Sequence, residues 1–212
     1  MIAVTRYHLA LLFASQRYLP PLLAFLALLA VLYTSANAPV APEFAVSAGG
    51  LVVVSCWLTV AVVDIEDPVH RLVTLAHARG SVAVVAGVVT GVLVVCAGCT
   101  ALSMGWAGLL HGGIAGDELL LGAGAHLAAT CTGVAAGLPC SRFVLPRIGY
   151  TVIAALVVIG IVFFVRWIPL VNPMLRALGT SSDAGHTVFV AVVTSAVALL
   201  VSAASTAFVS RR

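Results

Sequence analysis

The stretch SVAVVAGVVTGVLVVCAGCTALS, residues 81–103, contains no charged side chain. A transmembrane helix needs about 20 consecutive, mostly apolar residues, and this stretch supplies them without a break. The whole chain of 212 residues has the same character, since 62% of it is hydrophobic and only 8% is charged. Soluble domains contain roughly a quarter charged residues. The composition therefore excludes a single water-soluble domain and predicts an all-α membrane protein with several spans.

Other apolar stretches accompany residues 81–103, so we expect one transmembrane domain over residues 1–212 with six transmembrane helices. The connections are short. Residues 37–44, NAPVAPEF, are expected to form a proline-rich turn, and residues 166–186 form a longer, partly apolar connection. The expected spans are residues 20–36, 45–63, 81–103, 119–138, 148–165 and 187–208.

The N-terminal stretch MIAVTRYHLALLFASQRYLPP is apolar but interrupted by polar residues. Arg6 and Arg17 lie about three helical turns apart and therefore nearly on one face. We expect an interfacial helix over about residues 1–18, stopped by Pro20 and Pro21. A cleaved signal peptide is the alternative. Because Pro39 would directly follow its cleavage site, we expect the segment to be retained.

The positions of the arginines predict the orientation of the chain, because cytoplasmic loops of membrane proteins carry an excess of positive charge. With six spans and a cytoplasmic N-terminus, both termini face the cytoplasm. Only Arg166 and Arg176 then lie outside. The inner segments hold Arg6, Arg17, Arg71, Arg79, Arg142, Arg147, Arg211 and Arg212. The connection at residues 64–80 is therefore expected in the cytoplasm.

That connection, DIEDPVHRLVTLAHARG, has the pattern of a short amphipathic helix. Asp67 before Pro68 is a favoured helix start, and Gly80 is a typical stop. So short a helix is marginal in water on its own, so its apolar face should be covered by a partner or by the lipid interface. The apolar face comprises Val69, Leu72, Val73 and Ala76, and the polar side comprises His70, Arg71, Thr74 and His77.

The sequence offers little for catalysis. All basic residues other than histidine are arginines, so a P-loop lysine and Schiff-base chemistry are excluded. No H-E-x-x-H, no G-x-S-x-G and no acidic metal-binding cluster within a span occurs. His70 and His77 share a helix face without a third ligand nearby, which leaves a zinc site and a solvated polar face as alternatives. We expect no catalytic residue, no metal ligand and no directly bound cofactor.

Small residues within the spans predict packing. Cys96 and Cys99 form a C-x-x-C pattern in an apolar helix, and all the cysteines read as small core residues rather than a disulfide framework. Two glycine pairs have the spacing that permits close helix contact, although such spacings also arise by chance among 19 glycines. The pairs are Gly87 with Gly91 and Gly133 with Gly137.

His126 is the one ionisable residue that we place inside a predicted span. Such residues mark proton or ion pathways in some membrane proteins, whereas a lone histidine can also simply bond to a neighbouring helix. The predicted spans therefore contain too few ionisable groups to favour ion-coupled transport. If the protein transports a substrate, we expect the energy to come from another polypeptide docked at its cytoplasmic side.

This arrangement resembles the membrane subunits, or permeases, of type-2 ABC exporters. Members have an N-terminal interfacial elbow helix, six spans, a cytoplasmic coupling helix between spans two and three, and an apolar extracytoplasmic segment before span six. MIAVTRYHLALLFASQRYLPP, DIEDPVHRLVTLAHARG and RWIPLVNPMLRALG are similar to these three parts in the same order. The likeness covers the whole chain in architecture.

The resemblance implies a function and partners. The coupling helix would insert into a groove of a separate ATP-binding-cassette ATPase subunit, which holds the ATP and Mg²⁺, and two permease copies, identical or paired, would form the export path. No nucleic acid is implied. The expected location is a bacterial inner or plasma membrane. The residues assigned to ATPase coupling are Glu66, Asp67, Val69, Arg71, Leu72, Val73, Ala76 and Arg79.

Two other hypotheses stay open. A motor-free pore or secondary transporter would use helices lined by small polar residues, with His126 as the first candidate for an intramembrane polar site. A structural or assembly subunit of a larger membrane complex would bind partners other than an ATPase and would show no transport. The transported substrate is not predicted by any feature of the sequence.

Overall fold

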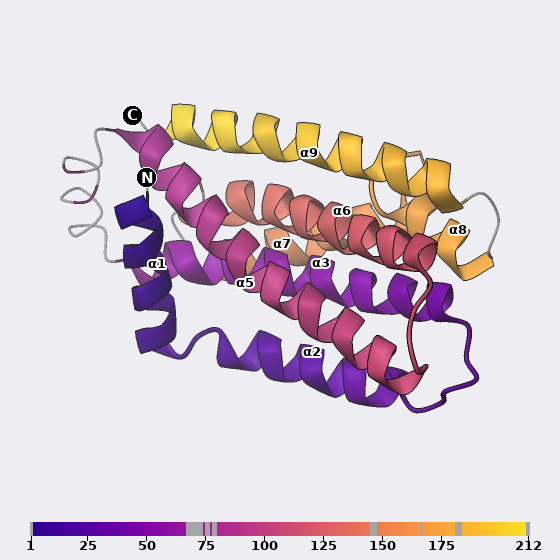
Figure 1. The fold of residues 1–212 in the computed structure, drawn as a ribbon. Helices are drawn as coiled ribbons and strands as arrows, with labels where there is room; N and C mark the ends of the chain where they lie inside the picture. Colours follow the sequence, from indigo (N-terminus) through magenta and orange to yellow (C-terminus); the bar gives the residue numbers. More distant parts are fainter. Residues whose placement is uncertain are drawn as a thin grey trace.

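The chain folds into a bundle of helices in the computed structural model, which describes residues 2–66, 74, 77, 80–144, 148–165, 167–180 and 184–210. No strand occurs among these residues, so the predicted all-α class is confirmed. Figure 1 shows the helices running mostly along one another. They are α1 (Ile2–Ser15), α2 (Leu19–Leu32), α3 (Val40–Ile65), α5 (Ser81–Leu110), α6 (Gly116–Cys140), α7 (Ile148–Phe164), α8 (Asn172–Thr180) and α9 (Ala184–Val209).

Four of these helices, α3, α5, α6 and α9, are long and apolar enough to cross a membrane. The shortest of them, α6, has 25 residues. At a rise of 1.5 Å per residue, a helix of that length exceeds the roughly 30 Å of a bilayer's hydrocarbon core. The structure therefore has the helices that a multi-pass membrane protein requires. The helix α7 has only 17 residues and α2 only 14, so six spans remain a prediction.

Prolines lie in the first turns of two helices, α2 and α3, and the start of α3 corrects one prediction. Residues 37–44 were expected to form a turn, yet α3 starts at Val40 and holds Pro42 in its first turn. Pro20 and Pro21 lie in the first turn of α2, and the N-terminal helix α1 ends before them, at Ser15. The first N–H groups of a helix have no acceptor within it, so a proline there loses no hydrogen bond.

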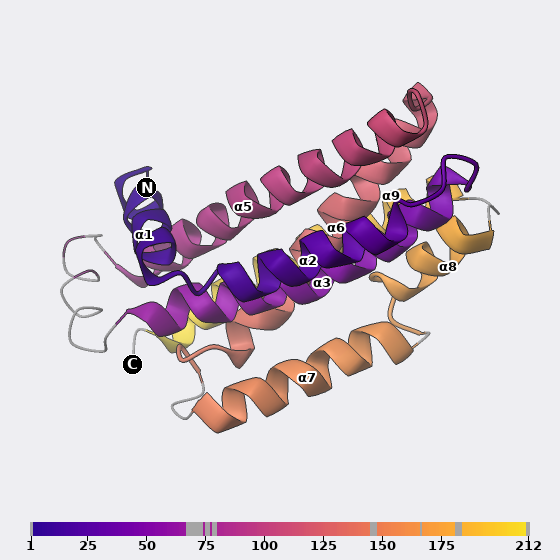
Figure 2. The ribbon, with the colours of Figure 1, turned by 90° about the horizontal axis from the view of Figure 1, so that it is seen from below.

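The helix α1 lies across one end of the bundle (Figures 1 and 2). It is bent by 80° from α2, and Gln16 between them has a φ of 56°. The helix rests on the Gly87–Gly91 face of α5, where a Cβ added to Gly87 would meet Val4 Cγ1 at 2.6 Å. This glycine pair therefore marks a real helix interface. A location of α1 at the membrane surface remains a prediction.

The helix α3 forms the centre of the bundle and contacts α1, α2, α5, α6, α7 and α8. Its contact with α6 is the most extensive in the structure. A Cβ on Gly133 would overlap Ser55 Oγ and the Val52 carbonyl, and one on Gly137 would lie 2.9 Å from the Cys56 carbonyl. The second glycine pair thus brings two backbones almost into contact, which only glycine permits.

The five cysteines also contribute to the close packing of the helices. All five are free and buried. Cys56 lies on α3, Cys96 and Cys99 on α5, and Cys131 and Cys140 on α6. They fill the interior as small apolar side chains, as the sequence predicted.

The helix α7 stands apart from the rest of the bundle (Figure 2). It contacts α6, α3 and α8, and large apolar side chains along it are exposed, including Ile153, Leu156 and Phe164. The short helix α8 follows it and lies at the end of the bundle opposite to α1 (Figure 1). The partly apolar connection predicted at residues 166–186 therefore contains a helix of its own.

The α3–α6 contact gives a first testable prediction. Gly133→Ala should lower the free energy of unfolding by about 1–3 kcal/mol, because the added methyl group overlaps backbone atoms that cannot move independently. The measurement is an equilibrium unfolding titration of the purified protein in detergent.

The matched control is Gly98→Ala on α5, where a Cβ would meet nothing within 4 Å. This variant should leave stability unchanged or raise it by up to about 1 kcal/mol, because alanine favours the helix over glycine. Equal stability of the two variants would contradict the close α3–α6 contact.

Candidate functional site

Glu66 lies where α3 leads into the connection toward α5. Its side chain is buried, with 5% exposed. The carboxylate Oε1 accepts a hydrogen bond from the Tyr7 hydroxyl at 3.4 Å and another from the Thr74 hydroxyl. Tyr7 lies on α1, so this one carboxylate joins α1, the end of α3 and the connection. Glu66 therefore holds Thr74 of the connection close to α1 and to the end of α3.

The other residues assigned to ATPase coupling lie outside the described residues. Of the predicted amphipathic helix the structure describes two residues, Thr74 and His77, both helical, and His77 is exposed. Gly80 has a φ of 126°, a conformation that strongly favours glycine, and α5 begins directly after it. The coupling residues outside the described ranges are Asp67, Val69, Arg71, Leu72, Val73, Ala76 and Arg79.

His126 is fully buried on α6, and both ring nitrogens have partners. Nδ1 lies 2.7 Å from the Gly122 carbonyl, which can only accept, so Nδ1 carries a proton. Nε2 lies 3.1 Å from the Ser47 hydroxyl on α3. The ring of Phe44 packs edge-on against the imidazole, with 5.9 Å between centroids. His126 is thus satisfied by its own helix and by α3, as a residue that joins two helices would be.

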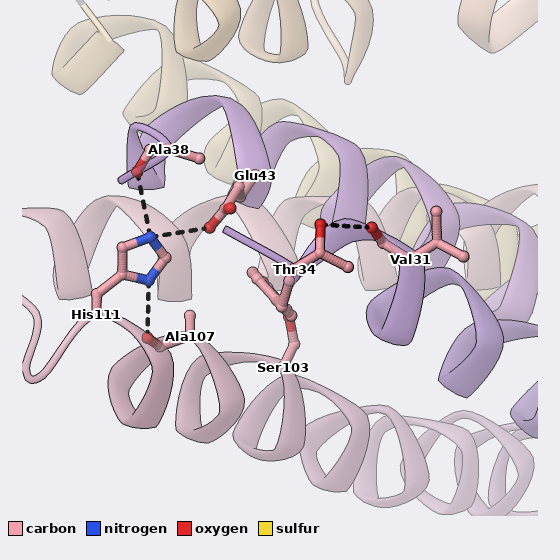
Figure 3. A network of polar contacts seen from close by, with 8 residues as sticks. Val31, Thr34, Ala38, Glu43, Ser103, Ala107 and His111 are labelled. Carbon is pink, nitrogen blue, oxygen red and sulfur yellow. Dashed lines mark hydrogen bonds and ion pairs between the residues drawn. The ribbon is translucent and has the colours of Figure 1, made fainter. Parts of the chain in front are cut away.

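A second buried pair was missed from the sequence. Glu43, in the first turn of α3, is only 4% exposed. Its Oε2 lies 3.5 Å from Nε2 of His111, which caps the C-terminal end of α5 (Figure 3). His111 Nε2 also lies 3.1 Å from the Ala38 carbonyl, and Nδ1 lies 2.9 Å from the Ala107 carbonyl. Both ring nitrogens therefore face only hydrogen-bond acceptors.

These groups form an outer polar network of Tyr33, Glu43, Ser103 and His111. The Tyr33 hydroxyl lies 2.9 Å from Ser103 Oγ in a buried contact, which joins the end of α2 to α5. The network lies near the end of the bundle opposite to α1. It ties the loop between α2 and α3 to the end of α5. These contacts join the end of α2, the start of α3 and the end of α5.

Two sequence signals pointed to the partners separately. His111 before Gly112 is a basic residue just after the end of a helix, and Glu43 is an acidic residue in a first turn. Each signal indicates one helix end, independently of the other. Neither signal specifies which residue lies opposite, because the two ends meet only in the folded bundle.

Among the described residues, no cluster of three or more histidine, cysteine or acidic side chains could hold a metal ion. His70 lies outside these residues, so the zinc alternative for His70 and His77 is not tested.

The chain matches no known family model, no curated protein and no solved structure. Its function is therefore inferred from its own residues.

The Glu43–His111 pair gives a second prediction. His111→Ala should lower the free energy of unfolding by about 3 kcal/mol or more, because it leaves a buried carboxylate without its partner. The double variant Glu43→Gln with His111→Ala should cost clearly less than the two single costs added together. Unfolding titrations in detergent would measure both effects.

His186→Ala is the matched control, since His186 is an exposed histidine near the start of α9. It should leave stability within about 0.5 kcal/mol of the original, as surface substitutions usually do. Additive costs for Glu43→Gln and His111→Ala would show that the two side chains do not interact.

Proposed function

We propose that this chain is the membrane-embedded permease subunit of an ATP-driven exporter. The observation that carries the proposal is the clustering of three features at one end of the bundle. The transverse helix α1, the ends of α3 and α5 that face each other along the chain, and the end of α9 all lie there (Figure 1). The sequence between α3 and α5, which is predicted to form an amphipathic helix, is the segment that a separate motor protein would bind.

The Glu66 contacts support a mechanical role for this end. A force on the connection reaches α3 and α5 directly, because the connection joins them. It also reaches α1 through the bonds between Glu66, Tyr7 and Thr74. The close packing of α6 on α3 at Gly133 and Gly137 would make these two helices move together. Closure of an ATPase dimer could thereby rock most of the bundle.

In this proposal the energy for transport comes from ATP hydrolysis by a separate protein. The sequence contains no P-loop lysine, so ATP and Mg²⁺ would bind to a partner ATPase subunit. Val69, Leu72, Val73 and Ala76 would fill a groove of that subunit, and the charges beside them would set the pairing at the rim. A second permease copy, identical or related, would complete the translocation path, and a bacterial inner membrane is the proposed location.

A secondary transporter is the alternative that a specific observation favours. His126 and the Glu43–His111 pair place ionisable groups in the interior of the bundle. Buried ionisable residues in membrane helices mark ion and proton pathways in other proteins. Against this alternative, the His126 ring nitrogens and the His111 ring nitrogens are all engaged with partners in the chain.

The proposal predicts a partner and a sensitive surface. An ATPase subunit should copurify with the chain in mild detergent, and the chain should stimulate its ATP hydrolysis. Leu72→Asp or Val73→Asp should abolish this stimulation, because a charge on the apolar face cannot enter an apolar groove. Membrane insertion should be unchanged. ATPase assays on the reconstituted complex would measure the effect.

His77→Asp is the matched control, because it adds the same charge at an exposed position on the polar side of the predicted helix. It should retain most of the stimulation. Unchanged activity of Leu72→Asp would refute the assigned role. Substrate flux in vesicles without ATP, lost in His126→Leu, would instead favour the secondary transporter.

A further inference from the structure

The contact between Ser47 and His126 suits the imidazole in either of two protonation states. Ser47 Oγ lies 3.1 Å from His126 Nε2 and 3.3 Å from the Phe44 carbonyl, and a hydroxyl has one proton to donate. When Ser47 donates to Nε2, the imidazole is neutral. When Ser47 donates to the Phe44 carbonyl, Nε2 can carry a proton and donate it to Ser47 Oγ. His126 can therefore take up a proton while each of these groups keeps a partner.

Glu43 supplies the negative charge that a buried imidazolium requires. It lies one helical turn before Ser47 on the same helix, so the two side chains share a face of α3. The carboxylate is buried, and its Oε1 accepts no hydrogen bond within the part of the chain that the structure describes. A buried acceptor without a donor is costly. Glu43 is therefore itself a group that a proton would stabilise.

The Tyr33 hydroxyl connects Glu43 to Ser47. Tyr33 is buried at the end of α2, and its hydroxyl interacts with the Ser47 hydroxyl and with the Glu43 carboxylate as well as with Ser103. A hydroxyl both donates and accepts hydrogen bonds and can rotate. A proton can therefore pass from Glu43 to His126 through Tyr33 and Ser47.

The polar chain begins close to water. His111 Nε2 lies 3.5 Å from Glu43 Oε2, and the two residues that follow His111, Gly112 and Gly113, are exposed. His126 is ten residues into α6 from its start at Gly116, which at 1.5 Å per residue is about 15 Å. The chain of polar groups thus leads from the end of the bundle opposite to α1 into its interior.

Few other ionisable groups surround His126. On α6 itself, Glu118 lies two turns before it and is half-buried. On α5, Cys96 interacts with Thr130, one turn after His126. The helices α7 and α9 carry no charged residue within their bounds, and their Tyr150 and His186 are exposed. Glu43 is therefore the buried acid that can act on His126.

We propose that His126 is a proton-binding site, loaded from the end of the bundle opposite to α1 through Glu43, Tyr33 and Ser47. The Glu43 carboxyl group gives its proton to the Tyr33 oxygen, while Tyr33 gives its hydroxyl proton to Ser47 and Ser47 gives its own to His126 Nε2. One proton moves in total. The carboxyl group becomes a carboxylate, the imidazole becomes an imidazolium, and each hydroxyl keeps one proton. The site does not depend on a partner ATPase.

Nuclear magnetic resonance of the full chain with isotope-labelled histidine, in lipid nanodiscs, tests the site. The His126 signals are those lost in His126→Gln. We expect His126 to become cationic as the pH is lowered in the folded protein.

At a pH where half of His126 is cationic, Ser47→Ala and Glu43→Gln should each lower the cationic fraction severalfold, because they remove the acceptor and the counter-charge. Ser55→Ala is the matched control, since the Ser55 hydroxyl donates to the Val52 carbonyl of α3. It should leave the fraction unchanged. A His126 that stays neutral until the protein unfolds, or equal cationic fractions in all three variants, would overturn the proposal.

A second measurement tests the route. After a rapid drop in pH, time-resolved infrared spectroscopy follows the protonation of His126, with His126→Gln as the reference. Tyr33→Phe removes the hydroxyl between Glu43 and Ser47, so proton uptake should slow by about tenfold or more, while the final cationic fraction should change little. Tyr150→Phe, at an exposed tyrosine on α7, should leave the rate unchanged. Equally fast uptake in Tyr33→Phe would overturn the proposed route.

Discussion

The contact between the backbones of α3 and α6 is the constraint on which the rest of the bundle depends. Gly133 and Gly137 leave no room for a side chain between the two helices. In a membrane the hydrophobic effect does not drive helices together, so close packing and buried polar contacts must do so. The helix α6 in turn packs against α9 and α5. A larger residue at either glycine would therefore separate several helices.

Buried polar contacts at its two ends give α3 its position along the bundle axis. Near its start, Glu43 pairs with His111 of α5, and one turn later Ser47 bonds to His126 of α6. At its end, Glu66 accepts hydrogen bonds from Tyr7 of α1 and from Thr74. A helix fixed at both ends transmits displacement along its length. This property suits the proposed function, in which a motor acts on one end and the translocation path responds.

The sequence predicted the membrane-spanning class well because apolar runs such as residues 81–103 admit few other structures. It failed locally at residues 40–44, where a turn was predicted but α3 begins at Val40 with Pro42 in its first turn. The Glu43–His111 pair was beyond prediction because its halves come from separate helix ends that meet only through the packing of α3 and α5. Glycine spacing suggested the interfaces, but the spacing alone does not identify which helix lies opposite.

The most direct test of the proposed placement, with the α1 end of the bundle in the cytoplasm, is the accessibility of single cysteines placed at the two ends of the bundle. Residue 77 is exposed and lies in sequence between α3 and α5, and residue 117 is exposed in the first turn of α6, at the end of the bundle opposite to α1. The native cysteines are buried and can be replaced by serine or alanine as background. We expect a membrane-impermeant maleimide to label residue 117 from outside intact cells and residue 77 only in inverted vesicles. Labelling of both residues from the same side, or of residue 77 from outside, would contradict the proposed placement.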